Sequence, residues 1–142
     1  MDYRILVFYQ KAQEVMQDVS RITPALQRAL QGREISRHLF RAAISVGANI
    51  AESHGRHMGQ EHFHYLTIAQ GSANEVDHWL HTALECEVAA PEIFKNLIAL
   101  NNETRKMLVT TLGTLRKKHS GSSIREPHTP YSPTPCIEED CE

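Results

Sequence analysis

The chain of 142 residues is long enough to bury a hydrophobic core within one domain. Its apolar fraction of 41% and charged fraction of 23% are typical of globular proteins, and no run reaches the roughly 18 apolar residues of a membrane span. The formal net charge of −2 divides unevenly, because residues 1–119 hold 14 Lys and Arg against 12 acids, while residues 120–142 hold one Arg against five acids. We therefore expect a slightly basic folded domain followed by an acidic tail.

The protein is expected to be cytoplasmic. The first ten residues contain too short an apolar run for a secretory signal peptide. The three cysteines, Cys86, Cys136 and Cys141, are an odd number, and the Cys-x4-Cys spacing of the last two matches no common zinc site. Free thiols in a reducing compartment, away from membranes, follow from these observations.

Apolar residues recur at steps of three and four from Ile5 to Ile22, which predicts a first helix. Pro24 follows this stripe and Gly32 closes the linking segment, so we place the boundary to the next helix there. The second helix is expected from about Glu34 to Ser53.

The second predicted helix is rich in small side chains, so a neighbouring helix backbone can approach it closely. Phe40 and Ile44 lie outside its main apolar seam, which indicates contact with more than one neighbour. A second group of small residues, Ala69–Ala73, occurs later in the chain. Together the two groups predict two helices pressed together. The small residues of the second helix are Ala42, Ala43, Ser45, Gly47, Ala48, Ala51 and Ser53.

Two glycines interrupt the helical pattern between His54 and Gly59, and a third helix is predicted from about Gln60. A fourth helix is predicted from Pro91, which suits a first turn because proline lacks an N–H group. It ends in the cations Arg116–Lys118, which complement the negative C-terminal end of the helix dipole.

From Ser120 onward, prolines, hydroxyl residues and acids leave little to bury, which predicts a disordered Pro-rich acidic tail over residues 120–142. No segment shows the strict alternation of a half-buried strand. Four long helices with short links over residues 1–119 predict an all-α protein, an antiparallel up-and-down four-helix bundle.

Two blocks of the sequence resemble the four-helix-bundle family of 23S rRNA intervening-sequence proteins, with order and spacing that agree across residues 3–118. The family pattern is Arg-Ala-Ala-x-Ser, Ala-Asn-Ile-Ala-Glu and Gly-x-Gly-Arg, followed by an acidic residue, a Phe-Leu-x-Ile-Ala-x-Gly-Ser run and a later Glu. Ser53 replaces the first glycine of the turn, and His62 stands where an aromatic or aliphatic residue is common. The matching segments are Arg41–Ser45, Ala48–Glu52, Ser53–Arg56, Glu61, Tyr65–Ser72 and Glu75.

The resemblance implies a bundle that assembles as a ring-like homo-oligomer, a homopentamer. It also implies kinship with the accessory protein of diversity-generating retroelements, whose partners are a reverse transcriptase and RNA. The family resemblance says more about the fold and the assembly of the chain than about its activity.

Arg33, Arg37 and Arg41 recur every four residues and form one ribbon of positive charge along the second helix. Such a ribbon can contact the phosphates of RNA or DNA, and a ring of subunits would repeat it around its axis. The alternative is an ordinary solvated helix face, in which Glu34 pairs with Arg37. Further cations of the predicted nucleic-acid-binding surface are Arg56, Lys106, Arg116, Lys117 and Lys118.

Four polar residues lie near the two groups of small residues. Because a buried polar group needs a hydrogen-bond partner, we expect them to form a network between the second and third helices or at a subunit contact. No nucleophile or phosphate loop accompanies them, so a catalytic role is not expected. These residues are Asn49, Glu52, Ser72 and Glu75.

Nine histidines raise a metal hypothesis. Glu61-x-x-His64 and Glu75-x-x-His78 have the spacing of di-iron bundles, but they lie on one helix, on the order of 20 Å apart, and cannot share a site within one chain. Surface histidines are the favoured interpretation. A site at a subunit interface remains an alternative, and it would use His54, His57 or His81.

Arg56 and His62 resemble the Arg-x4–6-His element of bundle-type ribonucleases, in which arginine stabilises phosphate charge and histidine moves a proton. Arg33 and His38 match the same spacing, which favours chance. We therefore expect no enzyme, no metal and no cofactor.

The favoured hypothesis is a non-enzymatic, oligomeric four-helix bundle that binds nucleic acid or scaffolds a nucleoprotein partner such as a reverse transcriptase. Two alternatives stay open. One is a histidine-dependent metal-binding or RNA-processing enzyme, and the other is a purely structural assembly protein.

Overall fold

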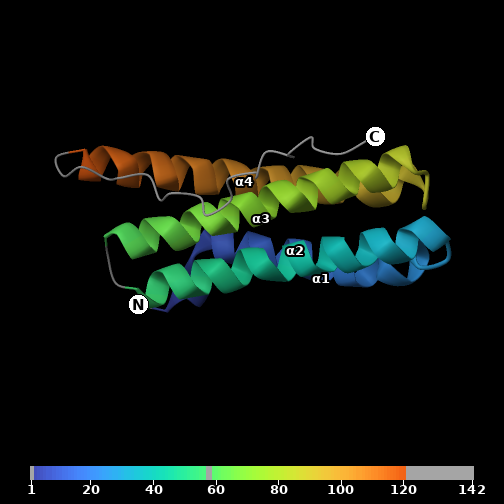
Figure 1. Ribbon diagram of the computed structural model, residues 1–142, viewed down its shortest axis with the longest axis horizontal. Coiled ribbons are helices and arrows are strands. Elements are labelled where there is room, and N and C mark those ends of the chain that lie inside the picture. Colours follow the sequence, from blue (N-terminus) through green and yellow to red (C-terminus); the bar gives the residue numbers. More distant parts are fainter. Residues whose placement is uncertain (1, 57–58, 121–142) are drawn as a thin grey trace, which may run out of the picture.

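A computed structural model describes residues 2–56 and 59–120, and within them the chain forms four long α-helices after one turn of 3-10 helix (Figure 1). The described residues contain no strand, so the all-α prediction is confirmed. The predicted tail beyond Ser120, with Cys136 and Cys141, lies outside the described residues. The elements are η1 (Tyr3–Ile5), α1 (Val7–Leu26), α2 (Leu30–Gly55), α3 (Gln60–Glu85) and α4 (Pro91–His119).

The helices run alternately up and down and lie side by side (Figure 1). Each helix packs against its neighbours in sequence, and α1 also packs against α4, which closes the arrangement around one core. Among the described helices, none combines the length and the hydropathy that crossing a bilayer requires.

The core is filled by large aliphatic side chains, together with alanines on α3 that let its neighbours come close. Several polar residues are buried as well, and Asn101 is one of them, at 1% exposed. Its Nδ2 donates to the carbonyl oxygen of Ala73 at 2.9 Å and so ties α4 to α3. Among the described residues, no buried side-chain nitrogen or oxygen lacks a hydrogen-bond partner. Large side chains that are fully buried include Leu26, Leu39, Ile50, Leu66, Leu80, Phe94 and Leu108.

The link between α1 and α2 is shorter than the sequence predicted. Pro24 lies within the last turn of α1, and α2 begins at Leu30, so the placement of Gly32 in the link was wrong. Gly32 is a buried residue of the first turn of α2, where an added Cβ would lie 1.9 Å from the carbonyl oxygen of Leu26. The glycine is needed for a close backbone approach and does not interrupt the helix. Ile5 was also misplaced, because it lies in η1 and is 58% exposed.

We expect Gly32→Ala to destabilise the fold by about 3 kcal/mol, because the methyl group meets a backbone carbonyl that cannot rotate away. The matched control is Gly113→Ala on α4, where the added Cβ meets nothing within 4 Å. The control should raise stability by roughly 0.5–1 kcal/mol through helix propensity. Urea unfolding followed by circular dichroism checks both values, and equal midpoints for the two variants would show that the α1–α2 turn is not tightly packed.

Candidate nucleic-acid interface

A small polar cluster joins the middle of α2 to the middle of α3. The hydroxyl oxygens of Ser45 and Ser72 lie 2.9 Å apart, and Asn49 Nδ2 donates to the Ser45 carbonyl at 2.8 Å and to its hydroxyl at 3.1 Å. Two serine hydroxyls meet only because the side chains around them are small. Of the four polar residues predicted near this contact, Asn49 and Ser72 therefore do lie in a network between α2 and α3.

Glu52 and Glu75, the other two predicted residues, are exposed and stand outside this cluster. Glu52 Oε1 accepts a hydrogen bond from Arg56 Nε at 2.9 Å, and this bond, together with the charge of the carboxylate, raises the pKa of Arg56. Glu75 makes no hydrogen bond or ion pair with any described residue. Spacing along the helix did not distinguish these exposed acids from the two residues at the contact.

The end of α2 and the start of α3 are joined by the two residues that depart from the family pattern. His62 Nδ1–H donates to the carbonyl oxygen of Ser53 at 2.8 Å, and Ser53 is itself buried. Gly59 has a φ of 95°, a left-handed conformation that favours glycine. One ring nitrogen of His62 is thus engaged with the end of α2, while Arg56 bonds to Glu52 of its own helix.

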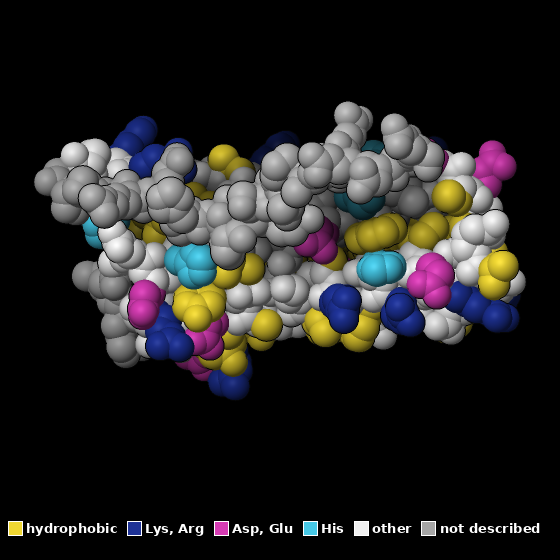
Figure 2. All heavy atoms as spheres, viewed as in Figure 1, with side chains coloured by type: hydrophobic (Ala, Val, Ile, Leu, Met, Phe, Trp, Pro, Cys, Tyr) yellow, Lys and Arg dark blue, Asp and Glu magenta, His cyan; other side chains and the backbone are white. Residues whose placement is uncertain are grey.

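Arg33, Arg37 and Arg41 are all exposed on the outer face of the N-terminal half of α2, and we call them the arginine ridge. Figure 2 shows Lys and Arg side chains gathered over this part of α2, beside a histidine and several hydrophobic side chains. Arg33 Nε donates to the Gln27 carbonyl at 3.2 Å, and Arg37 lies 3.7 Å from Glu34, an exposed pair that adds little stability. Arg41 pairs with no described residue, so the ridge keeps a net positive charge.

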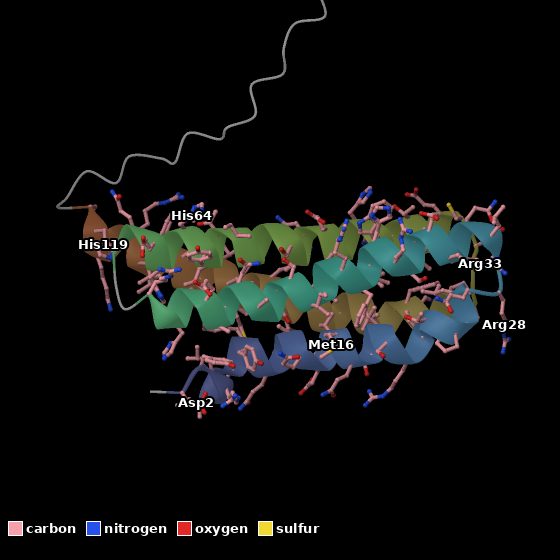
Figure 3. The ribbon with its side chains drawn as sticks, turned by 60° about the horizontal axis from the view of Figure 1, so that its bottom comes forward. Asp2, Met16, Arg28, Arg33, His64 and His119 are labelled. Carbon is pink, nitrogen blue, oxygen red and sulfur yellow. The ribbon has the colours of Figure 1, made fainter. Side chains whose placement is uncertain are left out.

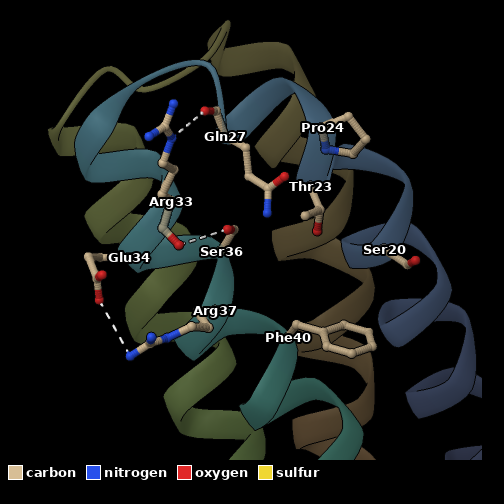
Figure 4. Close-up of a pocket in the computed structure, with 9 residues that line it drawn as sticks. All are labelled: Ser20, Thr23, Pro24, Gln27, Arg33, Glu34, Ser36, Arg37 and Phe40. Carbon is tan, nitrogen blue, oxygen red and sulfur yellow. Dashed lines mark hydrogen bonds and ion pairs between the residues drawn. The ribbon is translucent and has the colours of Figure 1, made fainter.

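A groove of about 770 Å³ runs between the end of α1 and the start of α2, and Arg33 and Arg37 of the ridge are among the residues that line it (Figure 4). The ring of Phe40 projects from α2 toward α1. The groove is lined by Ser20, Thr23, Pro24, Gln27, Arg33, Glu34, Ser36, Arg37 and Phe40. A second hollow of about 490 Å³ continues across α2 and is lined by Arg37, His38, Phe40, Arg41 and Ile44.

Three rings gather on the other side of the ridge, where α2 faces α3. His38 stacks on Trp79 with ring centroids 4.6 Å apart and planes 15° apart, and His78 meets Trp79 edge-on at 4.9 Å and 70°. In the sequence, His38 was only a chance match to the ribonuclease spacing, because only the register of α2 against α3 brings it to Trp79. A basic ridge flanked by aromatic rings is therefore a feature of the fold rather than of the linear pattern.

The other predicted cations do not extend this ridge. In Figure 3, Arg33 and His119 lie at opposite ends of the bundle. Arg56 is separated from Arg33 by most of α2, about 35 Å along the axis. Lys106 lines a polar groove between α3 and α4. The end of α4, near His119, carries Arg116, Lys117 and Lys118.

The described histidines do not assemble a metal centre. No group of three or more His, Cys, Asp or Glu side chains among the described residues is placed to hold a metal ion. His81 instead lies 3.5 Å from Asp77 on its own helix, and His57, one of the histidines considered for an interface site, lies outside the described residues.

Comparison with known proteins places the chain in a family. The model of the 23S rRNA-intervening sequence protein family matches residues 4–110, and the chain belongs to that family. It has the fold of a crystal structure from Bacteroides thetaiotaomicron, a protein of unknown function in the S23 ribosomal protein family. The two are 24% identical with a TM-score of 0.69, over 75% of this chain and 98% of the other. No curated protein matches the sequence.

The serine pair should show a measurable coupling. Ser45→Ala and Ser72→Ala each remove the same hydrogen bond, so we expect the double variant to lose less stability than the sum of the single variants, with a coupling energy of about 0.5–1 kcal/mol. Urea unfolding of the four proteins at one fixed concentration measures this energy. Strictly additive losses would mean that the two hydroxyls do not interact.

Proposed function

We propose that this member of the 23S rRNA-intervening sequence protein family is a non-enzymatic bundle that associates with copies of itself and binds nucleic acid through the arginine ridge. It does so alone or as a scaffold for a nucleoprotein partner such as a reverse transcriptase. The observation that carries the proposal is Arg41, which is exposed in line with two other exposed arginines and paired with no described residue. Cations that no neighbour neutralises are available to replace the counterions of phosphates.

The spacing of the ridge supports contact with a phosphate backbone. Arginines four residues apart rise by about 6 Å per step along a helix, so Arg33 to Arg41 span about 12 Å. The only carboxylate that pairs with the ridge among the described residues is Glu34, at 3.7 Å from Arg37. The family name refers to an intervening sequence of ribosomal RNA, which agrees with an RNA partner.

Self-association is supported by an apolar strip beside the ridge, which we define as Ile44, Ala48, Ile68 and Gly71. These residues are exposed on the outer side of α2 and α3, Ile44 at 45% and Ile68 at 37%. Gly71 lies in the middle of α3, where glycine costs about 1 kcal/mol relative to alanine, and a Cβ there would meet nothing within 4 Å. An exposed glycine among apolar residues suits the close approach of a second helix, and we propose a second copy of the chain.

The ribonuclease alternative receives less support from the geometry. Arg56 forms a hydrogen bond with Glu52 within its own helix, and one ring nitrogen of His62 donates to the carbonyl oxygen of Ser53. The first bond lies within the end of α2, and the second joins that end to the start of α3. A catalytic pair needs side chains directed at a common substrate atom.

The ridge should account for most of the electrostatic binding. We expect the triple variant Arg33→Gln, Arg37→Gln and Arg41→Gln to lose at least tenfold in affinity for a labelled 20-nucleotide RNA at low salt. The slope of log K against log salt should fall by about 2, since each phosphate contact contributes roughly 0.7 for a single strand. Fluorescence anisotropy from 25 to 300 mM KCl measures both.

The control for this variant carries the same change of net charge elsewhere. Arg4, Arg21 and Lys95 are exposed cations on η1, α1 and α4, and none of them lines either hollow beside the ridge. Their replacement by Gln should leave the affinity within about twofold of the wild type. Equal losses in the two triple variants would reduce the binding to net charge alone, and no binding by the wild type at 25 mM KCl would contradict the proposal.

The apolar strip should control the oligomeric state. We expect Gly71→Leu to lower the mass of the assembly by blocking the close approach, even though leucine is the better helix former. Gly113→Leu is the matched control, because Gly113 is also an exposed helical glycine with open space around its Cβ direction. Light scattering after size exclusion gives the masses. A monomeric wild type, or an unchanged mass for Gly71→Leu, would contradict assembly through this strip.

A further inference from the structure

We infer that the arginine ridge selects single-stranded over double-stranded nucleic acid, because aromatic rings beside it offer stacking positions that only unpaired bases can use. The inference rests on the proposed function and names the substrate class of the same surface. It is carried by the placement of Phe40 on one side of the ridge and of the stacked His38–Trp79 pair on the other.

The rings are positioned where bases would lie if phosphates met the arginines. Phe40 is 38% exposed and lines both the groove toward α1 and the hollow across α2, in each case together with Arg37. An exposed phenylalanine that contacts two basic hollows presents a flat apolar surface to whatever occupies them. Unpaired bases stack on such rings with little regard to sequence.

On the α3 side, His38 lines the same hollow as Arg37 and Arg41. Its other face is covered by Trp79 at 4.6 Å, so the indole backs the imidazole and holds it in place. A ring already held by a neighbour loses little conformational freedom when a base stacks on it. The ridge is therefore bordered by a stacking position on each side, with cations between them.

A duplex does not match these features. Its bases are paired and stacked on each other, so Phe40 and His38 would gain no base contact from it. The recognition helices of duplex-binding proteins enter a major groove about 12 Å wide. Here α2 is packed between α1 and α3, which flank the ridge and hinder entry into such a groove. A phosphate chain with exposed bases uses both the charges and the rings.

The test compares probes that separate phosphates from bases. The wild-type chain of 142 residues is titrated with four probes. These are a 20-nucleotide single-stranded RNA, the same sequence as single-stranded DNA, the corresponding 20-base-pair duplex, and an abasic strand of equal length and charge. We expect both single strands to bind about tenfold tighter than the duplex and the abasic strand. Trp79, the single tryptophan of the chain, should be quenched by the base-containing strands and not by the abasic strand.

Phe40→Leu tests the ring directly. Because Phe40 is partly exposed, leucine should preserve the fold, which circular dichroism checks. We expect this variant to bind the single strands five- to tenfold more weakly, while its affinity for the abasic strand and the duplex stays within twofold. The matched control is Phe8→Leu, the same change at a half-buried position near the other end of α1, which should alter none of these affinities.

The possible failures are distinct. The inference would be overturned if all four probes bound equally well and if Phe40→Leu left their affinities unchanged. Binding through the ridge would still stand in that case. Tighter binding of the duplex than of the single strands would overturn it as well, and so would equally tight binding of a poly-glutamate peptide. Binding of no probe would overturn both the inference and the proposed function.

Discussion

The close antiparallel contact between α2 and α3 is the constraint on which the other features depend. Small side chains on both helices make this close approach possible. As a result the two helices touch directly, for example where the hydroxyls of Ser45 and Ser72 meet. Once that register is set, His38 must lie against Trp79 nearer one end of the pair, and His62 must lie against Ser53 at the other. A shift of one helical turn, about 5.4 Å, would break all three contacts together.

The same contact determines what α2 can present to the outside. Most of its small and apolar residues are buried in the bundle, so its arginines and its few exposed apolar side chains lie along the remaining face. That face carries the arginine ridge in its first half and Ile44 and Ala48 of the apolar strip in its middle. Near its end, Glu52 and Arg56 neutralise each other. Charge is thus available for binding at only one end of the helix.

Much of the fold could be predicted from the sequence, because the period of apolar residues identifies both the helices and their buried faces. The failures came where one residue type has two physical uses. Gly32 has the signature of a helix boundary, yet it is a site of close backbone approach, and only the position of Leu26 distinguishes the two. Similarly, the basic residues could be listed from the sequence, but the sequence does not show which of them share one surface. The stacking of His38 on Trp79 joins residues far apart in the sequence, so it required the register of two helices.

The neighbouring positions of the ridge and the strip would connect the proposed binding with the proposed assembly. Arg41 and Ile44 lie three residues apart on α2, within one turn, so an interface built on the strip would bring the ridge close to its rim. Copies joined there would place several ridges on one assembly, and a long strand that reached two of them would be held at a high effective concentration at the second. The three arginines of one chain then need only bind weakly. Under the proposed function, a domain whose net charge is barely positive would suffice, because the number of copies, rather than the charge of each, would set the strength of binding.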